Sequence, residues 1–332
     1  IHGRTYNPWN DWASPGGSSG GASAAVMSGM GSLAHGNDIA GSLRIPSTAT
    51  GACTVKPGLG RVPAYNPSQT QERGLVAQLM SVQGIIAREI KDVRLGMQSL
   101  INYDPRDPWM VEMPFQSNSI TFPITIGYTK ETLGEVMHPA VNKALDNAIE
   151  ALEDAGYILE EIALPEFQDA ANFSAKTLFG ELRALLEKDF KNLGSKNFNL
   201  VADNYFKIIS PFEGDDLLLG MAKRSHFFRE WNLFFRKYPL VLTPFLLYPT
   251  YEWDRDTQGI EGTKEVLAGM FYAHTINYMG IPAGLVSANY NDGLPVGIQI
   301  ISSRFREDII LNACEEIEKR VGVMSERLFE KG

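Results

Sequence analysis

The stretch from Ser14 to Pro57 reads SPGGSSGGASAAVMSGMGSLAHGNDIAGSLRIPSTATGACTVKP and contains two clusters that place serine among small residues. The first cluster, residues 16–21, is Gly-Gly-Ser-Ser-Gly-Gly, and the second, residues 38–42, is Asp-Ile-Ala-Gly-Ser. Residues with little or no side chain let backbone N–H groups and a hydroxyl approach one substrate atom. This pattern is typical of a serine nucleophile beside an oxyanion hole.

Three runs within residues 14–63 carry a family resemblance: GGSSGGASAA from residue 16, GNDIAGSLRIP from residue 36 and VKPGLGRVP from residue 55. A fourth run, GIPAGLVSANYNDGLPVGIQIISSRFRED, covers residues 280–308. Together they resemble the amidase signature family of serine amide hydrolases, in particular its general amidases and indoleacetamide-hydrolase-like members. The separation of Ser18 and Ser42 is 42 − 18 = 24 residues, which matches the family pattern.

The resemblance implies a Ser–cis-Ser–Lys triad. Ser42 would be the nucleophile, and Ser18 would be the bridging serine on a cis Gly17–Ser18 peptide. The backbone N–H groups of four consecutive residues would form the oxyanion hole: Ile39, Ala40, Gly41 and Ser42. Four further residues are expected to support the site: Gly17, Ser19, Asp38 and Arg44. For Asp38 and Arg44 we favour ordering of the loop by charge-assisted hydrogen bonds over contact with substrate.

The chain departs from the family pattern in two ways. Ala40 stands where the family has glycine, and alanine disfavours a positive φ. The family lysine lies some tens of residues before the bridging serine, and a chain that begins at Ile1 starts too late to contain it. We therefore expect the sequence to be the C-terminal part of a longer protein and to be inactive alone. Lys56 is a weaker candidate for the base, and Lys91 fits a solvated helix face in residues 85–100.

Other interpretations of the first cluster fit less well. Gly16 to Gly20 matches the GxSxG nucleophile elbow, but residues 10–15 are a polar turn where the elbow needs a hydrophobic strand. No Lys-Ser/Thr pair closes a phosphate loop. A flexible linker is disfavoured because an alanine-rich helix is predicted at once, over Ala22–Gly29. His35 invites a Ser–His interpretation, although a structural role fits it better, and the histidine spacings indicate no metal site.

Composition excludes several classes of protein. The 332 residues are 44% hydrophobic, enough for a large core, and the net charge of −9 argues against a nucleic-acid partner. Two cysteines suit a reducing compartment, and proline interrupts the most apolar stretch, residues 238–251. We therefore expect a cytoplasmic protein with a small-molecule amide substrate, no cofactor, no metal and no membrane or nucleic-acid partner. A homodimer is left open.

The predicted fold is a single α/β domain over residues 1–332, with a mixed, mostly parallel sheet covered by helices on both faces. Strand, helix and strand over Thr121–Tyr128, Pro139–Ala155 and Tyr157–Leu164 form a βαβ unit, which favours parallel pairing. Further strands are expected at 240–243, 282–288 and 296–301, the last two around an Asn-Asp-Gly turn. Further helices are expected at 76–88 and on to 101, 170–190, across 198–238, 263–278 and 305–321.

The region 165–260 is expected to vary within the family and to form the substrate wall. It is rich in aromatic side chains: Phe206, Phe212, Phe227, Phe228, Trp231, Phe234 and Phe235. Aromatics at helical spacing fit either core packing or an acyl-binding pocket over Ser42, and both stay open. The predicted function is hydrolysis of a small carboxylic amide through an acyl-enzyme on Ser42. The alternatives are a non-catalytic binding or scaffolding relative and an amidotransferase A-type protein.

Overall fold

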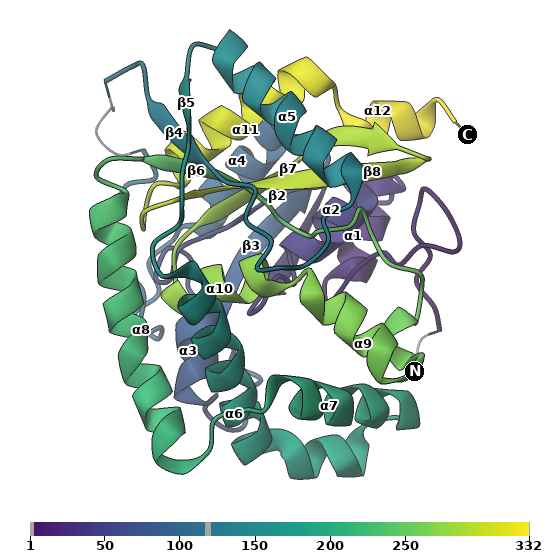
Figure 1. Ribbon diagram of the computed structural model, residues 1–332, viewed down its shortest axis with the longest axis vertical. Coiled ribbons are helices and arrows are strands. Elements are labelled where there is room, and N and C mark those ends of the chain that lie inside the picture. Colours follow the sequence, from purple (N-terminus) through teal and green to yellow (C-terminus); the bar gives the residue numbers. More distant parts are fainter. Residues whose placement is uncertain (1–2, 117–120, 332) are drawn as a thin grey trace.

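The computed structural model describes residues 3–116 and 121–331, and one 8-stranded sheet runs through it in the order β1-β3-β2-β7-β8-β6-β4-β5 (Figure 1). The strands are β1 Leu33–Asp38, β2 Cys53–Lys56, β3 Val82–Ala87, β4 Thr125–Tyr128, β5 Ile158–Glu161, β6 Leu240–Pro244, β7 Ala283–Asn291 and β8 Leu294–Ser302. The sheet is mixed, as predicted. The expected predominance of parallel pairs is not found, because only the β4·β5 and β4·β6 pairs are parallel and the other five pairs are antiparallel.

The parallel part of the sheet is the βαβ unit predicted from sequence, with β4 and β5 joined by α5, Pro139–Asp154. The antiparallel part of the sheet was underestimated. A short connection makes two strands antiparallel, and the β7–β8 hairpin turns within Asp292–Gly293. β1 and β2 were not predicted as strands, although both pair with β3. Their residues, LAHGND and CTVK, are too short or too polar to show a strand pattern.

The helices of the first half are α1 Gly20–Met27, α2 Arg44–Thr50, α3 Leu75–Met80, α4 Ile90–Leu100 and α5 Pro139–Asp154. Those of the second half are α6 Phe167–Leu193, α7 Lys196–Ile209, α8 Gly214–Phe234, the short 3₁₀ helix η1 Arg255–Thr257, α9 Gly259–Ala268, α10 Phe271–Met279, α11 Glu307–Val321 and α12 Met324–Phe329. The predicted helix 263–278 is in fact two helices, which are separated at Gly269 and Met270.

One predicted helix is wrong over half its length. Residues 76–88 were expected to be helical, but the chain leaves α3 after Met80 and forms strand β3 from Val82 to Ala87. β3 lies between β1 and β2 and pairs with both. A short apolar run fits a buried strand and a helix equally well, and here pairing on both edges decided for the strand.

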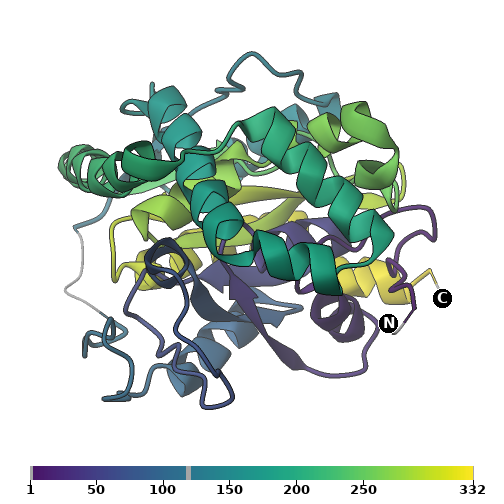
Figure 2. The same ribbon diagram turned by 90° about the horizontal axis from the view of Figure 1, so that it is seen from below.

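Helices cover both faces of the sheet (Figure 2). One hydrophobic core packs α4, α5 and α11 against the sheet, with Val141, Leu145 and Leu152 fully buried on α5. A second core, on the other face, packs α6, α8 and α10 and includes Phe227 and Trp231. α7 lies outside these layers at the far end of α6, as Figure 1 shows, and contacts α6, α9 and η1. None of the helices in the described ranges is long and apolar enough to cross a bilayer.

Candidate active site

The two serines singled out by the sequence line one cavity. Ser18 precedes α1, and Ser42 lies between β1 and α2. Both border a cavity of about 650 Å³, together with Gly17, Ile39 and Ala40. The peptide bond between Gly17 and Ser18 is cis. Two loops 24 residues apart in sequence therefore present their hydroxyl-bearing residues to the same space.

The two loops are joined directly. The Ser19 N–H donates to the Ser42 carbonyl at 3.2 Å. The side chain of Ser19 faces elsewhere, because a Cβ added to Gly36 of β1 would lie 2.7 Å from the Ser19 hydroxyl oxygen. Ser19 does not border the cavity. It therefore serves the site through its backbone, which ties the α1 loop to the α2 loop.

Gly41 has the unusual backbone conformation of the second loop. Its φ is +110°, and an added Cβ would meet Ala273 and Ile45 at 2.8 Å. Ala40 is not among the residues with positive φ. The alanine that departs from the family pattern is therefore tolerated, since the constraint that excludes a side chain falls one residue later.

Asp38 organises the loop that carries Ser42. Its two carboxylate oxygens accept the N–H groups of Gly41 at 2.7 Å and Leu43 at 3.2 Å. They also receive two nitrogens of the Arg44 guanidinium, at 3.0 and 3.1 Å. Asp38 and Arg44 are fully buried and neither borders the cavity. These contacts order the loop, and the Gly41 N–H donates to Asp38 instead of pointing to the cavity as a free donor.

Arg44 binds partners from the far end of the chain that the sequence did not indicate. Its guanidinium donates to the side-chain oxygen of Gln299 on β8 at 2.6 Å and to the side-chain oxygen of Asn277 on α10. The Asn277 amide in turn donates to the Asp38 carbonyl at 2.9 Å. The ring of Phe245 lies 5.2 Å from the guanidinium carbon. The loop of Ser42 is thereby fixed to the central strands and to α10.

The electrostatics of this network follow from its burial. Burial alone would raise the pKa of Asp38, but the charge and hydrogen bonds of Arg44, with smaller contributions from Lys56 and the Gly41 N–H, outweigh it and lower the pKa. His274 on α10, also buried, has its pKa lowered to about 4 by burial and by the Arg44 charge. It is neutral near pH 7, and its Nδ1 lies 2.6 Å from the Ser174 hydroxyl. His35, by contrast, is exposed on β1 and does not border the cavity.

Lys56 is buried at the end of β2, and its Nζ donates to the Pro57 carbonyl at 2.9 Å. Burial, and then the Arg44 charge, lower its pKa to about 7. A neutral lysine can act as a base, but Lys56 does not border the cavity, and neither does any other lysine in residues 3–116 and 121–331. Lys56 is therefore not among the side chains that share the cavity with the two serines. Lys91 is exposed and pairs with Glu89.

The rest of the cavity wall is mainly apolar. It comes from α6, α7 and the segment from Thr250 to Asp256, and includes five aromatic side chains of α6 and α7: Phe179, Phe190, Phe198, Tyr205 and Phe206. Of the aromatic residues expected from sequence, Phe206 alone lines it. Phe227, Trp231 and Phe235 are buried in the core, and Phe228 and Phe234 pack against it. The aromatic region is thus divided, because α8 packs into the core whereas α6 and α7 contribute aromatic side chains to the cavity that Ser42 borders.

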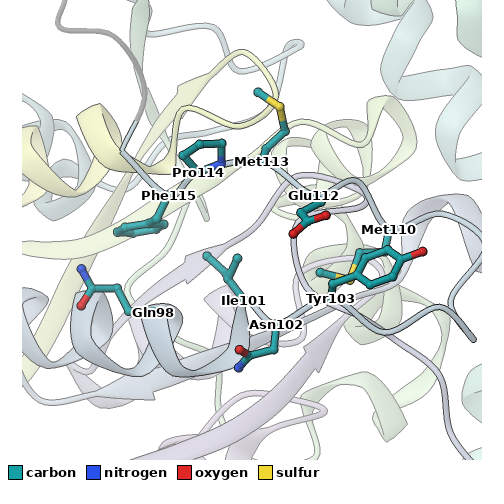
Figure 3. A pocket seen from close by; sticks show the side chains of 9 residues that line it. All are labelled: Gln98, Ile101, Asn102, Tyr103, Met110, Glu112, Met113, Pro114 and Phe115. Atoms are coloured by element: carbon teal, nitrogen blue, oxygen red, sulfur yellow. The ribbon is translucent and has the colours of Figure 1, made fainter.

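A separate cavity of about 440 Å³ lies beside the C-terminal end of α4 (Figure 3). Gln98 and Ile101 face side chains of the following segment there, among them Tyr103 and Phe115. None of the predicted site residues borders it. The cavity that contains both serines is therefore the candidate active site.

Loss of the buried Asp38–Arg44 ion pair is expected to destabilise the protein strongly. Asp38→Asn leaves the Arg44 charge buried without its counter-ion, and we expect the free energy of unfolding to fall by about 3–5 kcal/mol. Asp146→Asn is the control, because its ion pair with Lys130 is partly exposed and worth about 0–1 kcal/mol. Urea unfolding of both variants measures the difference. Equal losses in the two variants would contradict the assigned role of Asp38.

The architecture and the serine-lined cavity are those of a class of α/β hydrolytic enzymes built on a mixed sheet. The Amidase family matches residues 1–311, and the chain belongs to this family. It is thus a hydrolase of carbon–nitrogen bonds other than peptide bonds. The sequence had indicated the same family.

Individual relatives agree. The chain is 37% identical over 331 residues to an indoleacetamide hydrolase of Bradyrhizobium japonicum, covering 99% of this chain and 71% of that protein. It is 38% identical to an indoleacetamide hydrolase of Bradyrhizobium diazoefficiens, covering 99% of this chain and 63% of that protein. A glutamyl-tRNA(Gln) amidotransferase component of Methanosarcina acetivorans is 27% identical, with 98% and 72% covered. A bacterial aryl acylamidase of the amidase signature family shares the fold, with a TM-score of 0.77, 24% identity, and 98% and 70% covered.

Proposed function

We propose that the protein hydrolyses the amide of a small aromatic carboxylic acid to the free acid and ammonia, through an acyl-enzyme on Ser42. The observation that carries this proposal is that Ser18 and Ser42 border one cavity whose remaining wall is largely apolar and aromatic. An apolar cavity with a few polar groups at the reacting end suits an aromatic acyl group. The two indoleacetamide hydrolases among the relatives support the same substrate class.

In this mechanism the Ser42 hydroxyl attacks the amide carbon and passes its proton to Ser18, whose own proton goes to the base. The carbon–nitrogen bond then breaks as the proton returns through Ser18 to the leaving nitrogen, which departs as ammonia. Water attacks the ester on Ser42 by the same relay and releases the acid. The N–H groups of Ile39, Ala40 and Ser42 are the candidates to hold the oxyanion, since the Gly41 N–H already donates to Asp38.

The base in this proposal is the triad lysine that the family resemblance implies. Lys56 has a suitable pKa, but it is bound to the Pro57 carbonyl and lies away from the cavity lining. Geometry comes before pKa in assigning a general base. Turnover is therefore expected to depend on that lysine and not on Lys56.

An amidotransferase A-type role is the second candidate, because several relatives have that activity in their names. Glutamine would bring an α-carboxylate and an α-ammonium group into the cavity. Arg255 is the single cationic side chain among the described residues of the lining, and it is bound to Glu265 at 2.5 and 2.8 Å. Three carboxylates share the lining: Glu252, Asp254 and Asp256. Because Arg255 is already paired, the described lining offers no free cation to the glutamine carboxylate, which favours a neutral acyl group over glutamine.

Ammonia release from a panel of amides tests the proposal. In protein that carries the triad lysine, we expect kcat/KM for indole-3-acetamide and phenylacetamide to exceed that for glutamine by at least about 100-fold, because the described lining offers no unpaired cation to the glutamine carboxylate. A preference for glutamine would favour the amidotransferase role. Protein that neither binds nor hydrolyses any of these amides would favour the non-catalytic relative.

A further inference from the structure

A buried carboxylate stands at the base of the aromatic wall. Glu181 lies on α6 between Phe179 and Leu182, which both border the cavity of the two serines. Its own side chain does not border the cavity, and the residue is 5% exposed. It is also the last buried residue of α6. A carboxylate in such a place needs hydrogen-bond partners, and these show what it does.

The partners of Glu181 are backbone N–H groups at the start of α3. The Val76 N–H donates to one carboxylate oxygen at 2.7 Å, and the Ala77 N–H donates to the other at 2.8 Å. Both N–H groups are in the first turn of α3, where no partner is available inside the helix. Glu181 therefore caps α3 from another helix and fixes α6 against it.

The residue before α3 is shaped to this contact. Gly74 has φ −55° and ψ 154°, a conformation that alanine also adopts, so its backbone does not require glycine. A Cβ added to Gly74, however, would overlap the Glu181 carboxylate. The missing side chain of Gly74 is what lets the carboxylate reach both N–H groups.

The other end of α3 is joined to the loop of the nucleophile. The Met80 carbonyl accepts the Asn277 amide at 3.0 Å, and the same amide donates to the Asp38 carbonyl at 2.9 Å. Asp38 in turn orders the loop that carries Ser42. A continuous path of buried contacts thus connects Glu181, through α3, to the nucleophile.

Beyond Glu181 the wall has few other attachments. In residues 182–209, which contain the rest of α6 and all of α7, Asn204 alone is buried, and its amide donates to Thr263 on α9 at 3.0 Å. Two aromatic rings of the cavity lining, Phe190 and Phe198, pack edge to face across this part with centroids 5.2 Å apart. Figure 1 shows α3 beside α6 and α7 beyond them. The position of the wall therefore depends on how α6 is held at its base.

We propose that Glu181 is a positioning residue: by holding α6 on α3, it sets the distance between the aromatic wall and Ser42, and hence the size of acyl group that binds. This inference rests on the proposed function and deepens it. Glu181 does not touch the substrate and acts through the neighbouring wall residues. A large acyl group reaches the wall and senses its position, whereas a short one does not.

The ratio of kcat/KM for phenylacetamide to kcat/KM for propanamide tests this role, in protein that carries the triad lysine. Glu181→Gln keeps the shape of the side chain but places an NH2 group against a backbone N–H. We expect this variant to lower the ratio about 10-fold, through a higher KM for phenylacetamide, because the wall is displaced from its binding position. The values for propanamide should stay nearly unchanged.

Gly74→Ala tests the same contact from the side of α3. It leaves Glu181 in place but displaces the carboxylate, so it should lower the ratio in the same direction. The effects of Gly74→Ala and Glu181→Gln should not add in the double variant, because both break one contact.

Glu318→Gln is the matched control. Glu318 on α11 is also buried and caps another helix, since its carboxylate accepts the Ile90 N–H of α4 at 2.9 Å, but it belongs to the opposite face of the sheet. It should lose stability to urea much as Glu181→Gln does and leave the ratio unchanged.

Two results would overturn the role of Glu181 and leave the proposed function standing: an unchanged ratio in Glu181→Gln, or an equal fall in Glu318→Gln. If the unmodified protein hydrolyses neither amide, the proposed function falls and this inference falls with it.

Discussion

Ser42→Ala is expected to abolish amide turnover, lowering kcat by at least about 10⁴-fold, because it removes the atom that forms the acyl bond. A fluorophosphonate should label the unmodified protein at Ser42, and this variant should not be labelled. Peptide mass spectrometry locates the adduct. The experiment requires protein that turns over amide, since an unactivated serine reacts slowly.

Ser14→Ala is the control for this result. Ser14 also borders the cavity, and its hydroxyl accepts the Gly16 N–H at 3.1 Å, but it lies outside the proposed relay. Labelling of Ser42 should persist in this variant. An adduct on Ser18 in the unmodified protein would contradict the assignment and favour a nucleophile elbow at Gly16 to Gly20.

Ser18→Ala is expected to lower kcat by about 10³-fold while the fold and the affinity for amide are retained. The physical reason is that the hydroxyl passes protons in the transition state and contributes little to binding the ground state. Steady-state kinetics give kcat, and calorimetry with the acid product gives the affinity. Both are compared with thermal unfolding of the same variant.

Ser19→Ala provides the comparison at the neighbouring position. The Ser19 side chain packs toward Gly36, and its link to Ser42 is through the backbone, which the substitution preserves. Its loss of turnover should be smaller than that of Ser18→Ala by at least an order of magnitude. Near-normal turnover in Ser18→Ala would exclude the relay and require a different path for the proton.

The helices with strong periodicity could be predicted from sequence because their signal is local. α5 places Val141, Leu145 and Leu152 on one face, and α11 was found in the same way. Local sequence patterns did not predict elements whose conformation depends on pairing with other strands. The residues of β3 form a strand because β1 and β2 lie on either side, and no window of its own sequence shows them.

The residues of the candidate site likewise fall into those that could be predicted from the sequence and those that could not. The glycine–serine clusters, their spacing and the family resemblance pointed to Ser18, Ser42 and their loops from the sequence alone. The residues that hold the loop of Ser42 could not be predicted, since Asn277 and Gln299 meet Arg44 from 233 and 255 residues away. A single amide side chain in a helix or strand carries no sign of its partner.

Site residues that lie close together in the sequence, such as the small residues around the Ser18 and Ser42 hydroxyls, could therefore be predicted from the sequence itself. The shape and polarity of the substrate wall were decided by the tertiary structure. Tyr205, Tyr251 and Asp256 come from a helix, a loop and a 3₁₀ turn, and only packing brings them to one cavity with the serines. The conformation of the two glycine–serine loops depends on neighbours along the chain, whereas a binding surface depends on which distant elements share a core.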